Sequence, residues 1–171
     1  MRSRSGPVAL AAGRYETSAF SPRVSVELPA GWASLHEDES CFDVHRPLSG
    51  PGHAEGPIWD VAVLVTRVEG DDAPGDVIDV LEENPSLELG AEARAAIDGA
   101  EGISVDVEAT DDSTVVSFPG GSLSALRGRK LRVYAVDVGG QTVVVAVDGA
   151  AESFAEDVDA AAPVLAALEF G

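Results

Sequence analysis

Hydrophobic and polar residues alternate along several stretches of the chain, as they do in β-strands that bury one face. Segments 24–28 and 103–108 both place Val, Ile or Leu at every second position, with Ser, Asp or Glu between them. Glycine and proline clusters, such as the one in segment 47–57, interrupt these stretches and predict turns and loops. The pattern therefore indicates short strands, most of them joined to their neighbours in the sequence.

Two stretches stand out from this background. Segment 58–68 contains the unbroken aliphatic run 61–65, which favours a central strand covered on both faces over a strand with one wet face. Segments 129–138 and 141–148 flank Gly139-Gly140, and two glycines supply the positive φ angles that a two-residue hairpin turn requires. We expect a central strand and a long hairpin.

Two segments change to helical spacing. Pro74 suits the first turn of a helix whose apolar face carries Val77, Ile78 and Leu81, and Asn84-Pro85 would end it. From Ala151 onward, apolar residues recur at steps of four and three, namely Phe154, Val158, Ala161, Leu165 and Leu168. Pro163 predicts a kink there or a second helix start, and Glu169-Phe170 a final stub of strand.

Strands that are mostly adjacent in sequence, together with two amphipathic helices, predict the α+β class, an antiparallel sheet with helices packed on its faces. No repeat or long linker divides the chain. We therefore expect a flexible segment 1–12 followed by one domain over 13–171.

Composition narrows the possible partners. The chain has 171 residues, and 30 acidic against 11 basic residues give a formal charge of -19, which would repel nucleic acid and anionic lipid. Five-residue aliphatic runs are too short to span a membrane, so no membrane insertion is expected. As it stands the sequence predicts a cytoplasmic protein, or an exported one if a leader has been removed. The single Cys41 excludes an intrachain disulfide.

Several turn and corner residues suggest a family. They are Gly13-Arg14-Tyr15, Thr17, Phe20-Ser21-Pro22, Leu28-Pro29-Ala30-Gly31-Trp32, Ile97-Asp98-Gly99 and the ending from Pro163 to Phe170. In this order they resemble the PsbP-like superfamily, whose members are α/β/α sandwiches about an antiparallel sheet. The resemblance implies non-enzymatic work, as in photosystem II accessory subunits, a nuclear-import accessory factor, chaperone-like adaptors and actinobacterial lipoproteins. It carries over no catalytic residue.

All three histidines fall within one segment that is also rich in carboxylates. His36, Asp43, His45 and His53 could supply imidazole and carboxylate ligands to a metal ion, and strand alternation would place Cys41, Asp43 and His45 on one face. The spacing matches no zinc signature, so the alternative is a group of surface histidines beside a proline-rich loop.

A short basic run is the other charged candidate. Arg127, Arg129, Lys130 and Arg132 could contact an anion or an acidic partner. In so acidic a chain, however, cations on a strand can equally pair with neighbouring carboxylates.

Trp59, Asp60 and Trp32 are the candidate ligand-binding residues. Trp59 lies between the 47–57 loop and the expected central strand, where an aromatic side chain could line a groove. The leading hypothesis is a non-catalytic binding or adaptor domain, without a cofactor, that presents a sheet face or this groove to a protein partner or a small apolar ligand. The alternatives are a metal-binding protein and a structural module of a larger assembly.

Overall fold

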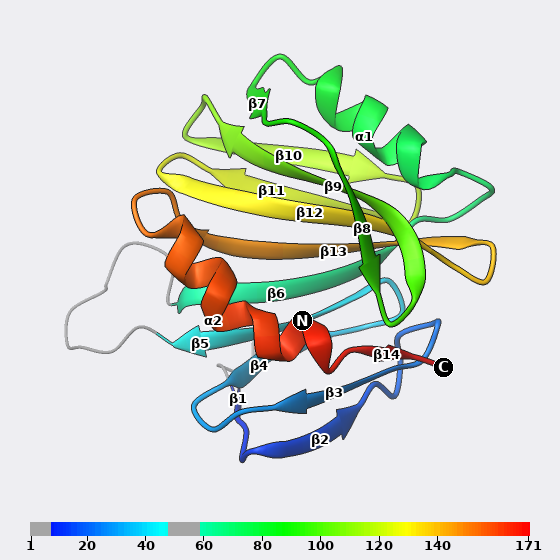
Figure 1. Cartoon of the computed structure of the whole chain (residues 1–171), viewed down its shortest axis with the longest axis vertical. Coiled ribbons are helices and arrows are strands. Elements are labelled where there is room, and N and C mark those ends of the chain that lie inside the picture. Colours follow the sequence, from blue (N-terminus) through cyan, green and yellow to red (C-terminus); the bar gives the residue numbers. More distant parts are fainter. Residues whose placement is uncertain (1–7, 48–58) are drawn as a thin grey trace, which may run out of the picture.

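A nine-stranded antiparallel sheet forms the centre of the computed structural model, which describes residues 8–47 and 59–171 (Figure 1). Its spatial order is β1-β4-β5-β6-β13-β12-β9-β7, and β8 also pairs with β9. In chain order the strands are β1 (Val8–Ala9), β4 (Ala33–Glu37), β5 (Cys41–Pro47), β6 (Trp59–Arg67), β7 (Leu87–Leu89), β8 (Ala93–Ile97), β9 (Ala100–Ala109), β12 (Arg129–Val138) and β13 (Gln141–Ala150). Strand β1 pairs with β4, although it lies within the segment 1–12 that the sequence predicts to be flexible.

The middle of the sheet is buried on both faces. In β6 the run from Val61 to Val63 is at most 3% exposed, and β13 is buried from Thr142 to Gly149. Side chains at odd and even positions of these strands enter two separate apolar clusters, one on each face. The unbroken aliphatic run therefore does mark a central strand.

The long hairpin is also confirmed. Val138 pairs with Gln141 across Gly139 and Gly140, whose φ angles are 64° and 91°. Because both turn residues adopt positive φ without a steric cost only when they are glycine, the sequence fixes this turn locally.

One face of the sheet is covered by α1 (Pro74–Glu82) and a two-stranded sheet, β10 (Ser113–Phe118) with β11 (Gly121–Leu126). The predicted residues Val77, Ile78 and Leu81 are each no more than 2% exposed. The β10–β11 hairpin is missing from the sequence prediction, which assigns only a turn at Phe118 to Ser122.

The opposite face is covered by α2 (Phe154–Ala166), which lies across β6 and β13 (Figure 1). A three-stranded sheet, β14 (Glu169–Phe170), β3 (Val24–Leu28) and β2 (Gly13–Glu16), continues this layer. The predicted final strand is thus present, paired with β3. Strand β2 begins at Gly13 and ends at Glu16.

The helix α2 differs from its prediction in two ways. It is one helix that continues through Pro163, without a second start. Its buried face includes Asp157 at 5% exposure, while Val158 and Leu165 are only half-buried. Asp157 tolerates burial because its carboxylate accepts hydrogen bonds from the Ala150 backbone N–H and the Ser153 hydroxyl.

The result is a sheet with a helix on each face, each helix extended sideways by a small sheet. In the described ranges 8–47 and 59–171, neither helix has the length and apolar character needed to cross a bilayer.

Candidate functional site

An apolar pocket opens between the three-stranded sheet β14-β3-β2 and strand β5. Its volume is about 180 Å³, and its apolar walls include Leu10, Tyr15, Val24, Val26, Phe42 and Val44. Val24 and Val26 alternate on β3, and Phe42 and Val44 alternate on β5, so each strand turns the same kind of face to the pocket. The two strands belong to different sheets.

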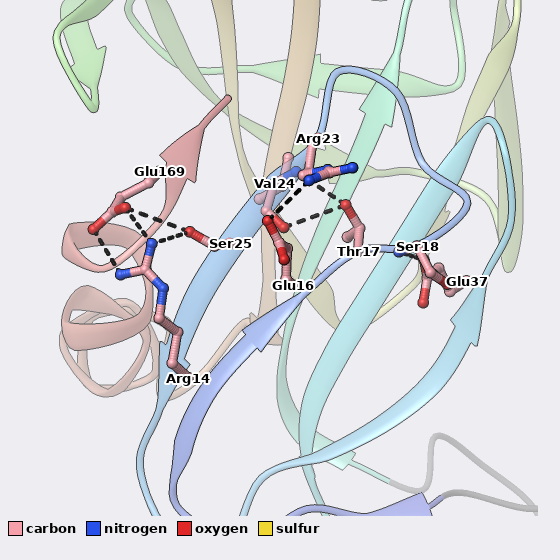
Figure 2. Close-up of polar contacts among 9 residues, drawn as sticks. All are labelled: Arg14, Glu16, Thr17, Ser18, Arg23, Val24, Ser25, Glu37 and Glu169. Atoms are coloured by element: carbon pink, nitrogen blue, oxygen red, sulfur yellow. Dashed lines mark hydrogen bonds and ion pairs between the residues drawn. The ribbon is translucent and has the colours of Figure 1, made fainter.

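Two acidic residues, Glu16 and Glu37, are also among the residues that line this pocket. The Glu37 carboxylate accepts hydrogen bonds from the Ser18 and Ala19 backbone N–H groups at 2.5 and 2.8 Å (Figure 2 shows the Ser18 contact). Burial raises the pKa of Glu37, but these hydrogen bonds outweigh it and leave the pKa below its ordinary value. Glu37 is therefore ionised at neutral pH. Glu16 lies 3.5 Å from the Arg23 guanidinium, and its side chain is 58% exposed.

Polar contacts hold the three-stranded sheet β14-β3-β2 beside the pocket (Figure 2). Thr17 exchanges hydrogen bonds with the backbone of Val24, its amide donating at 2.8 Å and its hydroxyl accepting at 2.9 Å. Arg14 donates to the Glu169 carboxylate at 2.6 Å and to the Ser25 hydroxyl at 2.7 Å. These contacts join β2, β3 and β14 and so fix the wall formed by Val24 and Val26.

Whether the hydrogen bonds to Glu37 stabilise the fold can be tested by the pH dependence of unfolding. A carboxyl whose folded-state pKa is depressed adds stability above its unfolded value, near 4.5, and loses that contribution as pH falls through the folded value. We expect acidification below about pH 4.5 to cost the wild type more stability than Glu37→Gln, measured by denaturant unfolding across the acidic range. The exposed Glu27 on β3 supplies the control Glu27→Gln, which should follow the wild-type profile. Parallel profiles for wild type and Glu37→Gln would contradict the prediction.

A second group of polar side chains gathers at the start of β6. The Trp59 indole N–H donates to Asp148 at 2.9 Å, and Arg129 binds the other oxygen of Asp148 at 2.7 Å. Arg129 also donates to the backbone carbonyl of Asp60, whose carboxylate pairs with Arg46. Trp59, Asp60 and Arg129, predicted as members of two separate sites, are thus neighbours.

His45 joins this group from β5. Its side chain is fully buried, and its ring lies edge-to-face against Trp59 with centroids 6.1 Å apart. Within the described part of the chain neither ring nitrogen has a hydrogen-bond partner. Burial lowers the pKa of His45, so the ring is neutral at neutral pH. This histidine is neither on the surface nor beside His36.

The remaining predicted site residues are dispersed. Trp32 is 4% exposed in the apolar cluster beneath α2. Like Arg129 with Asp148, the other cations of the basic run each have a carboxylate nearby: Arg127 faces Asp112, Lys130 faces Glu108, and Arg132 binds Asp106 at 2.7 Å. The positive charges of this run therefore pair with carboxylates of the same chain, as the alternative interpretation expects.

The predicted metal ligands do not form one group. His36 pairs in register with Asp43 across β4 and β5, whereas His45 is in the interior and His53 is outside the described residues. The donor atoms that do gather are those of His36, Asp38 and Cys41, all within 4.8 Å of one another. Burial and the neighbouring Asp38 raise the pKa of the Cys41 thiol, which favours its protonated form. No spacing pattern in the sequence indicates this set, because it depends on the turn between β4 and β5.

Comparison with known proteins defines the fold. No protein-family model matches the sequence, and a search of curated proteins finds no match. Among solved structures, a variant of the protein Mog1 has a TM-score of 0.51 at 11% identity, covering 92% of this chain and 96% of that one.

Two further structures are similar. A protein from Bacteroides thetaiotaomicron has a TM-score of 0.50 at 13% identity over 95% of this chain, which spans 49% of that protein's length. A cyanobacterial PsbP from Synechocystis has a TM-score of 0.48 at 12% identity over 98% and 97% of the two chains. At such low identity the Mog1 likeness shows the fold alone, and it confirms the expected α+β fold, an antiparallel sheet with helices packed on its faces.

Proposed function

We propose that this chain is a non-catalytic binding module that captures a basic protein segment by taking one apolar side chain of that segment into the pocket between β3 and β5. The observation that carries the proposal is the apolar pocket, whose lining residues include the acidic residues Glu16 and Glu37.

The size of the pocket favours a side chain over a whole small molecule. Its volume of about 180 Å³ is below the roughly 300–1,000 Å³ of typical small-molecule sites. A single Leu or Phe side chain, buried on binding, would contribute about 1.5–3 kcal/mol. Pockets that receive one apolar anchor are common at the centres of protein interfaces.

Charge favours a basic segment around that anchor. Glu37 is ionised, Glu16 is more than half exposed, and the chain carries a formal charge of -19. Such a field speeds the approach of a basic partner and slows that of an acidic one. The Trp59 region is a weaker candidate for this role, because its indole N–H and the Asp148 and Asp60 carboxylates are already bonded within the chain.

The proposal is tested by titrating isotope-labelled protein with a short peptide of lysines around one central leucine and following the backbone amide signals. We expect shifts at Tyr15, Val26 and Val44, and affinity that falls as salt rises. Replacing the peptide's leucine with alanine should weaken binding by about tenfold or more, the equivalent of burying one apolar side chain. A glutamate-flanked peptide should not bind.

A matched pair of protein variants locates the site. Leu10→Trp places a bulky ring in the pocket from a half-buried position, and should abolish binding. Val115→Trp adds the same ring at a position 58% exposed on β10, and should leave binding intact. Equal binding by both variants, or by the acidic peptide, would overturn the proposal.

A further inference from the structure

Three donor atoms of different chemical classes meet at the turn that joins β4 to β5. They are a ring nitrogen of His36, a carboxylate oxygen of Asp38 and the sulfur of Cys41, and all lie within 4.8 Å of one another. We propose that His36, Asp38 and Cys41 bind one zinc ion.

The distances suit a tetrahedral ion. With bonds of about 2.0–2.3 Å from zinc to nitrogen, oxygen and sulfur, neighbouring ligand atoms stand roughly 3.3–3.6 Å apart. His36 Nε2 and Asp38 Oδ2 are now joined by a hydrogen bond of 2.8 Å. An ion placed between them needs shifts of an ångström or so. The His36 side chain is 53% exposed, so its rotation can supply those shifts.

The turn itself orients the central ligand. Asp38 Oδ1 accepts hydrogen bonds from the backbone N–H groups of Ser40 and Cys41, at 2.8 and 2.9 Å, and from the Ser40 hydroxyl. These contacts fix the carboxylate and direct Oδ2 toward His36, as the outer hydrogen bonds of metal-ligating carboxylates do.

The donor set selects the type of ion. Sulfur and imidazole nitrogen favour zinc over magnesium or calcium, which take oxygen ligands. Three protein ligands leave the fourth position of a tetrahedral ion to water. Glu37 and Glu39 flank Asp38 in the sequence, and the charge of -19 attracts divalent cations to the chain.

Calorimetric titration of the metal-free full chain with zinc chloride tests the site. We expect one ion per chain, and Cys41→Ser and His36→Ala should each weaken binding by at least about tenfold. Glu39→Gln removes a neighbouring carboxylate outside the cluster, and His53→Ala removes the histidine that lies outside the described residues. Both controls should bind zinc as the wild type does.

Cobalt substitution supplies an independent readout. Cobalt bound to the wild type should show the near-ultraviolet band of a thiolate ligand, and Cys41→Ser should lose it while His53→Ala keeps it. Absence of a stoichiometric ion in the wild type, or zinc affinity unchanged in Cys41→Ser, would overturn the site. Peptide binding by metal-free protein is measured separately, so the two proposals can fail independently.

Discussion

Replacing Asp148 with alanine is expected to lower the free energy of unfolding by about 3–5 kcal/mol, the usual cost of breaking a buried ion pair. Asp148 and Arg129 are 2.7 Å apart, and each side chain is only 9% exposed. The substitution would leave the Arg129 guanidinium buried without its carboxylate and the Trp59 N–H without its acceptor. Urea unfolding followed by Trp fluorescence measures the change.

Two controls separate the pair from its surroundings. Asp106→Ala breaks the more exposed pair with Arg132 and should cost no more than about 1 kcal/mol. The double variant Arg129→Met with Asp148→Leu removes both charges and should recover most of the loss, because apolar side chains of similar size often replace a buried pair without cost. A single-variant cost equal to that of Asp106→Ala would contradict the prediction.

The titration of Asp148 agrees with this account. Burial raises the pKa of Asp148 above its ordinary value, although Arg129 and the Trp59 N–H both oppose the rise. A carboxyl with a raised folded-state pKa lowers stability as pH climbs from its unfolded to its folded value. Ionising Asp148 is therefore less favourable in the fold than in water, and the harm of Asp148→Ala comes from the unpaired guanidinium.

Gly102→Ala should destabilise the protein by about 3 kcal/mol, near the upper end of the range for overpacking. Gly102 lies on β9 between β8 and β12, and a Cβ there would clash with the backbone carbonyl oxygen of Ala135. Backbone cannot rotate away as a flexible side chain can. Relief would require β9 and β12 to separate.

Gly75→Ala is the matched control, with the opposite sign. Gly75 is in the first turn of α1, and no atom lies within 4 Å of an added Cβ. Alanine should therefore stabilise the protein by about 0.4–1 kcal/mol through the reduced freedom of the unfolded chain. Thermal unfolding of both variants checks the pair, and similar shifts in the same direction would contradict it.

Local patterns predicted the elements that depend on local physics. An aliphatic run marks the strand at 61–65, two glycines allow the positive φ angles of the Gly139-Gly140 turn, and Pro74 suits the start of a helix. Strand β8 escaped prediction because its Ala-rich sequence has little β-propensity, and its pairing with β9 is what makes it a strand.

The candidate sites depend on contacts between distant residues, which no spacing shows. Asp157 has the place of a polar residue on a helix surface, yet it is buried because the end of β13 supplies a donor to it. His45 has its environment set by Trp59, and Cys41 meets His36 only through the turn. The pocket needs two strands from different sheets, so its lining could be assigned only from the structure.

The pairing of β14 with β3 has a consequence for synthesis of the protein. Glu169 pairs with Ser25, 144 positions earlier in the chain. At about 5–20 residues per second, a ribosome needs roughly 7–30 s to make the intervening segment. Throughout that time Val24, Val26 and Leu28, all buried in the finished fold, lack the strand β14 and helix α2 that pack against β3. The β2–β3 hairpin is therefore synthesised early, but it gains its pairing with β14 only at the end.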